Sequence, residues 1–147
     1  MSRWLLGISL LVSFSAHAGP DVPVLEASDD ELRISYLCQA SMVGDVHTVG
    51  VLAVDAGTDL GGFCRCYAKQ VMADPKKLEP YTNVLQAIIR LRHEHATHFF
   101  DMAAIHAAHA IEDGSIDTFT NVDLRNAQDD MPETHYMLYD NNGQCVK

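Results

Sequence analysis

The chain has 147 residues, enough for one domain, and carries 20 acidic against 10 basic side chains, a formal net charge of −10. A surface this acidic repels phosphate backbones and anionic lipid headgroups, which excludes nucleic acid as a favoured partner. No stretch of the sequence reaches the roughly 18 consecutive apolar residues of a membrane-spanning helix, so we expect no membrane span.

Residues 1–18 have the pattern of a cleavable secretory signal peptide. Arg3 gives a basic start, residues 4–12 form a short apolar run, and Ala16-His17-Ala18 fits the small-x-small cleavage pattern. Cleavage after Ala18 would leave residues 19–147 as the mature domain, with nine basic and 20 acidic side chains and a net charge of −11. We therefore expect a periplasmic or secreted protein. A buried N-terminal helix is the alternative interpretation.

The four cysteines of the chain, Cys38, Cys64, Cys66 and Cys145, indicate two disulfide bonds in an exported domain. On a helix, Cys64 and Cys66 would point to nearly opposite sides and could not join each other. Cys38 is therefore expected to pair with one of them and Cys145 with the other, in an order that the sequence leaves open. A reduced Cys-x-Cys metal site is the alternative.

The first helix is expected from about residue 29 to residue 43. Ser28 and Glu31 have the spacing of a capping box, and Gly44 suits the end of the helix. Residues 46–60 fit either a short strand or a buried helix, and we favour a helix because a lone strand would have nothing to pair with. Residues 57–62 contain three glycines and fit a connection.

A further helix is expected from residue 63 to residue 73, ended by Asp74-Pro75. The longest signal is a single amphipathic helix from Pro80 to about Ile111, with Gly114 just past its end. Its expected apolar face is formed by Leu85, Ile88, Ile89, Ala96, Phe99, Phe100, Ala103, Ala107 and Ala110.

After Gly114 the chain is polar, and residues 121–125 suggest only another helical turn or two. Residues 135–139 form a last apolar patch, and residues 140–143 fit a turn that brings Cys145 back to the domain. The whole pattern predicts an all-α fold: a small disulfide-stabilised bundle of about four helices, in which the 80–111 helix is the central packing element.

Histidine is unusually frequent on the expected 80–111 helix. Five side chains would form a stripe beside its apolar face: His95, His98, Met102, His106 and His109. Imidazole and thioether ligands together suit copper, and imidazoles alone suit zinc, copper or nickel, so a copper- or zinc-binding protein is one hypothesis. The alternatives are packing at a half-buried boundary and a response to mild acid, since histidine changes charge near pH 6.5.

The sequence holds no Gly-x-Ser-x-Gly motif, phosphate-binding loop or dinucleotide fingerprint. His98 and Asp101 could be imagined as a catalytic pair, but a surface contact between residues three apart is the simpler interpretation. We therefore expect no enzyme and no catalytic residues. The favoured hypothesis is a non-catalytic domain that binds another extracytoplasmic protein, as an inhibitor, immunity factor or accessory protein, with a basic partner as the natural electrostatic match.

Overall fold

The computed structural model describes residues 28–146, which fold into helices joined by short connections and contain no strand. The all-α prediction is thus confirmed, with six helices in the described part instead of about four. They are α1 (Asp29–Met42), α2 (Val46–Asp55), α3 (Leu60–Ala73), α4 (Pro75–Glu94), α5 (Phe100–Glu112) and α6 (Asn121–Asp140). The predicted signal peptide, residues 1–18, lies outside the described residues.

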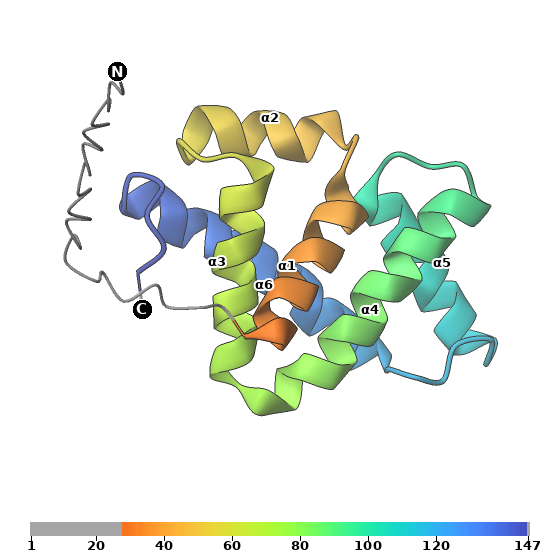
Figure 1. The fold of residues 1–147 in the computed structure, drawn as a ribbon. Coiled ribbons are helices and arrows are strands. Elements are labelled where there is room, and N and C mark those ends of the chain that lie inside the picture. The colour runs from red at the N-terminus through yellow and green to blue at the C-terminus, as the bar shows by residue number, and fades with distance from the viewer. Residues whose placement is uncertain (1–27, 147) are drawn as a thin grey trace, which may run out of the picture.

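Helices α3 and α4 form a V in the centre of the molecule, joined at its point by Asp74 (Figure 1). Helix α1 packs against both arms of the V, and α6 crosses behind them and contacts both arms as well. Helix α5 packs beside α4, and α2 lies across the open end of α3. The largest fully buried side chains, including Phe63 and Tyr67 on α3 and Tyr81 on α4, fill the space between these helices.

Both disulfides have the arrangement that the sequence predicts, and the structure supplies their order. Cys38 on α1 joins Cys64, and Cys66 joins Cys145 beyond the end of α6. Because Cys64 and Cys66 sit two residues apart on α3, their side chains leave the helix in different directions and reach different partners. All four cysteines are oxidised in this structure, so the alternative of a reduced Cys-x-Cys metal site is wrong.

The first two helices begin and end where polar side chains can satisfy their backbone. The Ser28 side chain accepts a hydrogen bond from the Glu31 amide at the start of α1, which is one half of the predicted capping box, and Gly44 follows the helix with a left-handed backbone, φ +84°. The uncertain segment 46–60 contains a helix, α2, so the helical interpretation is confirmed. Asp45 caps it by accepting from the Thr48 amide.

The expected 80–111 helix is wrong at both its start and its middle. Helix α4 already begins at Pro75, because Asp74 caps it by accepting from the Lys76 amide and Pro75 fits the first turn. It ends at Glu94, and a linker of residues 95–99 separates it from α5. Phe99 is correspondingly exposed, as is Ala96, whereas sequence periodicity had placed both on the apolar face.

The break between α4 and α5 is a Schellman motif followed by a turn. Ala96 has a left-handed backbone, φ +48°, its amide donates to the carbonyl of His93, and the Thr97 amide donates to the carbonyl of Arg92. Glycine usually occupies the left-handed position of this motif. Because position 96 holds alanine, the sequence carries no recognisable signal for the end of the helix.

The side chains of Arg92, on α4, and of Asp45, directly before α2, hold this linker in place. The Arg92 guanidinium reaches from α4 to the end of α1 and donates to the carbonyls of Ser41 and Val43 as well as to that of His98. Buried Asp45 accepts from the Phe100 amide at 3.2 Å and so caps α5 in addition to α2. These contacts join residues about 50 positions apart, which periodicity along one helix cannot reveal.

Helix α6 is much longer than the one or two turns expected at residues 121–125. Thr120 and Asp123 form a complete capping box at its start, and the helix continues through Pro132 to Asp140. Its buried positions, Leu124, Ala127, Thr134 and Leu138, recur at spacings of three, four and seven. Two of these four residues, Ala127 and Thr134, are small or polar, so the apolar stripe is hard to recognise in the sequence.

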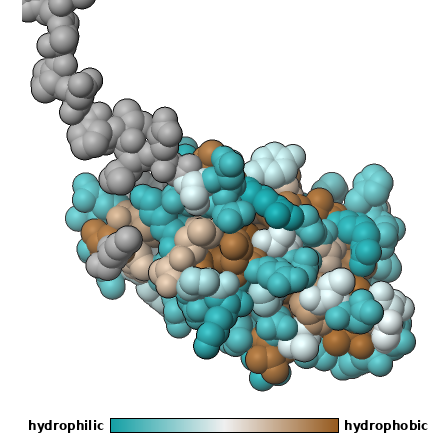
Figure 2. Space-filling view, turned by 60° about the horizontal axis from the view of Figure 1, so that its bottom comes forward, coloured by the Kyte–Doolittle hydropathy of each residue, from teal (hydrophilic) through white to brown (hydrophobic). Residues whose placement is uncertain are grey.

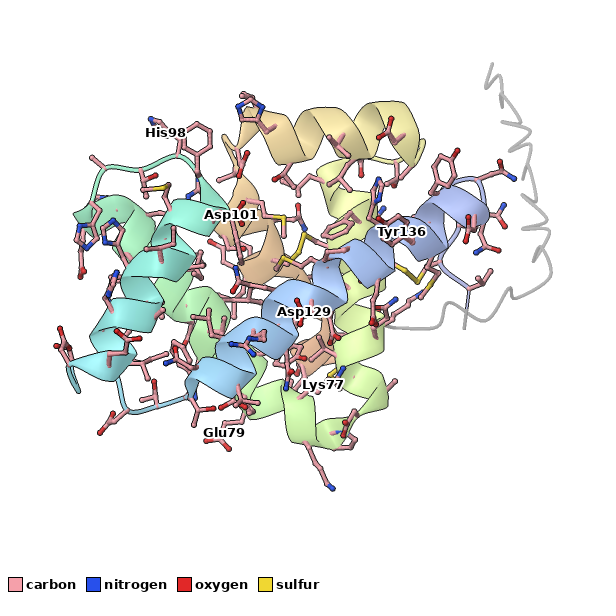
Figure 3. All side chains as sticks on the ribbon, turned by 180° about the vertical axis from the view of Figure 1, so that it is seen from behind. Lys77, Glu79, His98, Asp101, Asp129 and Tyr136 are labelled. Atoms are coloured by element: carbon pink, nitrogen blue, oxygen red, sulfur yellow. A yellow bond between two sulfur atoms is a disulfide. The ribbon has the colours of Figure 1, made fainter. Side chains whose placement is uncertain are left out.

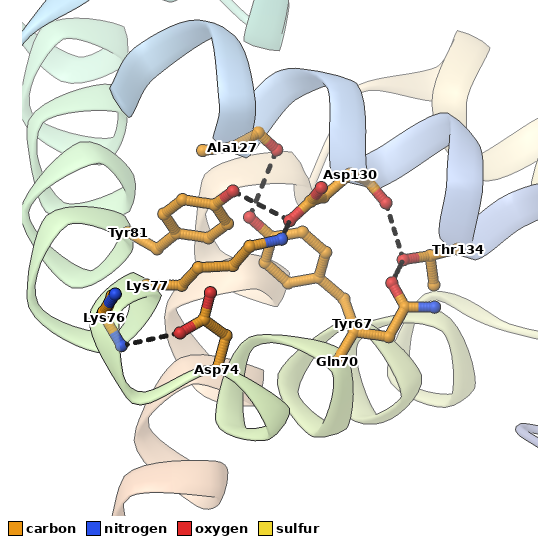
Figure 4. A network of polar contacts seen from close by, with 9 residues as sticks. All are labelled: Tyr67, Gln70, Asp74, Lys76, Lys77, Tyr81, Ala127, Asp130 and Thr134. Atoms are coloured by element: carbon orange, nitrogen blue, oxygen red, sulfur yellow. Dashed lines mark hydrogen bonds and ion pairs between the residues drawn. The ribbon is translucent and has the colours of Figure 1, made fainter. Parts of the chain in front are cut away.

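A buried polar network ties α3, α4 and α6 together (Figure 4). Asp130 on α6 accepts from the Tyr81 hydroxyl at 2.8 Å and pairs with Lys77 at 2.6 Å. The Tyr67 hydroxyl donates to the carbonyl of Ala127 at 3.2 Å. Burial raises the pKa of both tyrosines above the ordinary value, and for Tyr81 the hydrogen bond to Asp130 and its negative charge add to the effect.

The surface is predominantly polar, with hydrophobic residues in separate patches between hydrophilic ones on the face that Figure 2 shows. Within residues 28–146, none of the helices combines the length and the apolar character needed to cross a bilayer. The larger exposed apolar side chains include Tyr136 and Tyr139 on α6 and Val46 on α2.

Candidate functional site

An open groove of about 410 Å³ with a mainly apolar lining lies in the described part of the chain, and we call it the α2–α6 groove. It lies where α2 faces α6, next to the start of α5; in Figure 3, α2 is above α6, with Asp101 at the α5 end and Tyr136 farther along α6. Its apolar lining consists of Met42, Val51, Leu52, Phe63, Phe100, Met131, Pro132 and Tyr136. Its polar lining consists of His47, Thr48, Asp101, Gln128 and His135.

The helices that form the groove are held by capping hydrogen bonds and by packing in the core. Asp45 positions α2 and α5 together because its carboxylate caps both helices. The floor includes Phe63 and Leu52, each 2% exposed and part of the core. Helix caps and core packing therefore fix part of the walls of the groove.

Histidine 135 has an unsatisfied ring nitrogen in the groove wall. Its Nε2 atom is buried and has no hydrogen-bond partner in the structure. On the α2 side, the ring of His47 stacks on Phe99, with centroids 5.7 Å apart. Because this nitrogen is buried, a ligand in the groove can reach it only if the His135 ring turns.

The lining of the groove includes one acidic residue, Asp101, and neither lysine nor arginine. Asp129 shares a face of α6 with Pro132 and Tyr136 because it precedes them by three and seven residues, and it is exposed. Glu133, also exposed, lies one turn beyond Asp129.

The predicted histidine stripe is not a stripe, because the helix that would carry it is interrupted at residues 95–99. His95 follows the last residue of α4, His98 lies in the linker, and Met102, His106 and His109 are on α5. The structure brings His95 and His106 together, with parallel rings whose centroids are 3.7 Å apart. His109 instead lies 3.6 Å from Glu112, and the carbonyl of His98 accepts from Arg92.

No group of three or more histidine, cysteine, aspartate or glutamate side chains among residues 28–146 is arranged to hold a metal ion. Of the five residues predicted as copper or zinc ligands, the structure therefore retains a close pair. Metal binding by this chain stays a prediction, now limited to His95 and His106 with Met102 one turn before His106.

Sequence reasoning did not find the α2–α6 groove. Its lining comes from α1, α2, α3, α5 and α6, and none of these segments alone has a recognisable motif. The one available signal was the apolar patch at residues 135–139, of which Tyr136 lines the groove and stays 65% exposed.

Comparison with known proteins gives no family to which this fold can be assigned. No family model, curated protein or solved structure matches the chain. Function therefore has to be inferred from the chemistry of the groove and of the histidine pair.

Proposed function

We propose that this chain is an exported, non-catalytic binding domain that holds a basic segment of another extracytoplasmic protein in its α2–α6 groove. The observation that carries the proposal is the groove itself, which combines about 410 Å³ of space, mainly apolar walls and one acidic residue, Asp101, in its lining. Pockets of this kind receive the aromatic or aliphatic anchor side chains that supply most of the affinity of a protein interface.

The acidic surroundings favour a partner that carries lysine or arginine next to the anchor. Asp101 lines the groove, Asp129 and Glu133 lie on the adjoining face of α6, and the whole chain has a net charge of −10. Complementary charge of this kind accelerates encounter and selects against acidic competitors.

The disulfides support an extracytoplasmic location for this binding. Cys38–Cys64 and Cys66–Cys145 are intramolecular bonds of a kind that persists in oxidising compartments and is rare in the cytosol. The signal-peptide pattern of residues 1–18 supports the same location, periplasmic or secreted.

A selection from random peptides displayed on phage tests the proposal without knowledge of the natural partner. We expect enriched peptides to place a bulky apolar residue next to lysine or arginine, and their affinity to fall as salt is raised from about 50 to 300 mM, because the Debye length shortens in that range. Enrichment of acidic peptides, or of none, contradicts the proposal.

Matched variants then locate the binding site. Tyr136→Ala should weaken binding of the selected peptides about tenfold, as truncation of an aromatic contact commonly does. Tyr139→Ala is the control, because Tyr139 is similarly exposed, 57%, on the same helix but does not line the groove. Asp101→Asn should reduce the salt dependence, whereas Asp117→Asn, at an exposed aspartate between α5 and α6 that does not line the groove, should not. Equal losses in each variant and its control would place binding elsewhere.

A further inference from the structure

His95 and His106 form a stacked pair on the side of the molecule made by α4 and α5. His95 directly follows α4, and His106 lies in the second turn of α5. Their ring planes differ by 3° and their centroids are 3.7 Å apart. His95 is exposed and His106 is half-buried, so solvent and small ions reach the pair.

The backbone on both sides of the pair is fixed by contacts that do not involve the rings. The Schellman motif at Ala96 sets the conformation next to His95, and Arg92 donates to the carbonyl of His98 at 2.9 Å. Asp45 caps the start of α5. The two imidazoles are therefore held near each other by the α4–α5 hairpin, and bringing them together for a ligand requires little loss of conformational freedom.

The ring nitrogens of the pair are not committed to other protein groups. In the described part of the chain, neither ring makes a hydrogen bond or an ion pair, whereas His109 has Glu112 nearby. Imidazole nitrogens bind zinc at about 2.0–2.1 Å, so one ion can join two nitrogens that are up to about 4 Å apart. The ring centroids are 3.7 Å apart and the rings are parallel, so rotation about the side-chain bonds has to open the stack before an in-plane lone pair of each ring can point at the same ion.

We infer that His95 and His106 together bind one divalent transition-metal ion, with Cu²⁺ bound most tightly. Two neutral imidazoles suit copper, zinc and nickel and do not suit magnesium or calcium, which require oxygen ligands. Among these divalent ions the general order of affinity places copper first. No third histidine or carboxylate completes the set among residues 28–146, so water fills the other coordination positions.

This metal site is separate from the α2–α6 groove. None of the residues that line the groove belongs to the pair, and the two sites involve different parts of α5: Phe100 and Asp101 at its start line the groove, and His106 lies in its middle. Failure of either proposal therefore leaves the other intact.

Calorimetric titration of the purified, disulfide-bonded chain with Cu²⁺ and with Zn²⁺ tests the inference. We expect one Cu²⁺ per chain at this site, a weaker Zn²⁺ response, and copper electron paramagnetic resonance that shows two nitrogen ligands. His95→Ala and His106→Ala should each weaken copper binding about tenfold or more, since loss of even an outer partner of a ligand costs about 10- to 100-fold.

His93→Ala and His109→Ala are the matched controls, because both residues are exposed histidines on α4 and α5 outside the stacked pair. Circular dichroism of the metal-free variants verifies that each one folds, and His106→Gln replaces His106→Ala if the alanine variant does not. Absence of Cu²⁺ binding overturns the inference. So does binding that survives loss of His95 or His106, or that is lost equally in the two controls.

Discussion

Asp130 joins α6 to α4 through polar contacts of its side chain. Its side chain is shared by the Tyr81 hydroxyl and the Lys77 ammonium group, and its backbone carbonyl accepts from Thr134 (Figure 4). Each of these groups would be costly to bury alone, and together they satisfy one another. The side chain of Tyr67 enters the same region and finds its partner in the carbonyl of Ala127.

The raised pKa of Tyr81 predicts a loss of stability at alkaline pH. In the unfolded chain a tyrosine titrates near pH 10, and burial and Asp130 raise the pKa of Tyr81 in the folded state. The unfolded state therefore releases its proton first, so the stabilisation is complete below about pH 10 and is lost as pH rises further. We expect urea unfolding curves to show this decline between about pH 9.5 and 11.

The Tyr81→Phe substitution removes the hydroxyl and keeps the aromatic ring, so it tests the contribution of the hydroxyl alone. At pH 8 we expect it to lower the free energy of unfolding by about 1–2 kcal/mol, because a hydrogen bond to a charged acceptor is lost. Above pH 9.5 the free energy of unfolding of this variant should fall less steeply with pH than that of the wild type. Tyr136→Phe, at an exposed tyrosine, should retain the wild-type slope. A Tyr81→Phe slope equal to the wild-type slope would contradict this assignment.

At the scale of the helices, the boundary between α4 and α5 determines where every residue after Glu94 lies. A Schellman motif ends α4 although its left-handed position holds alanine, Ala96. A left-handed backbone costs a residue with a Cβ roughly 1–2 kcal/mol, and here Arg92 and Asp45 offset that cost by holding the linker on both sides.

Ala96→Gly should therefore stabilise the protein, because glycine adopts the left-handed conformation without strain. We expect the free energy of unfolding to rise by about 0.5–1 kcal/mol, since the greater freedom of glycine in the unfolded chain cancels part of the gain. Ala110→Gly inside α5 is the control, and it should destabilise by about 1 kcal/mol. Chemical denaturation checks both, and destabilisation by Ala96→Gly would show that φ at this position is not strained.

The elements that sequence reasoning predicted well are those whose signals are local. Ser28 and Gly44 framed α1 correctly, and the spacing of Cys64 and Cys66 excluded a bond between them. The break at Ala96 could not be predicted, because its determinants, Arg92 and Asp45, act through partners about 50 residues away. Periodicity continues across such a break, so two helices were taken for one.

The candidate site was the least predictable part of the molecule. The histidines drew attention because of their number, but only His95 and His106 are brought together, across a hairpin that the sequence did not reveal. The groove depends on how α2 and α6 are placed, and α6 itself was expected to be one or two turns long. A concave surface made by separate helices is a property of the assembled fold and has no local sequence pattern.

For the whole molecule, the Cys66–Cys145 bond links stability to the proposed function. It joins residues 79 positions apart and anchors the chain beyond α6, the helix that forms one wall of the groove. Cys38–Cys64 closes only 26 positions and joins α1 to α3. In the chain-entropy model the longer loop contributes about 4.5 kcal/mol and the shorter about 3.5 kcal/mol.

Removing the longer bond should therefore affect the end of α6 first. We expect Cys66→Ala/Cys145→Ala to lower the free energy of unfolding by about 4 kcal/mol and to speed amide hydrogen exchange selectively at residues 134–146. Cys38→Ala/Cys64→Ala is the control, since it also removes one disulfide but leaves α6 anchored. Because Tyr136 belongs to the loosened segment, only the first variant should also lose affinity for groove-binding peptides. Equal exchange at residues 134–146 in both variants would show that packing alone, through Leu138 and Thr134, holds this wall of the groove in place.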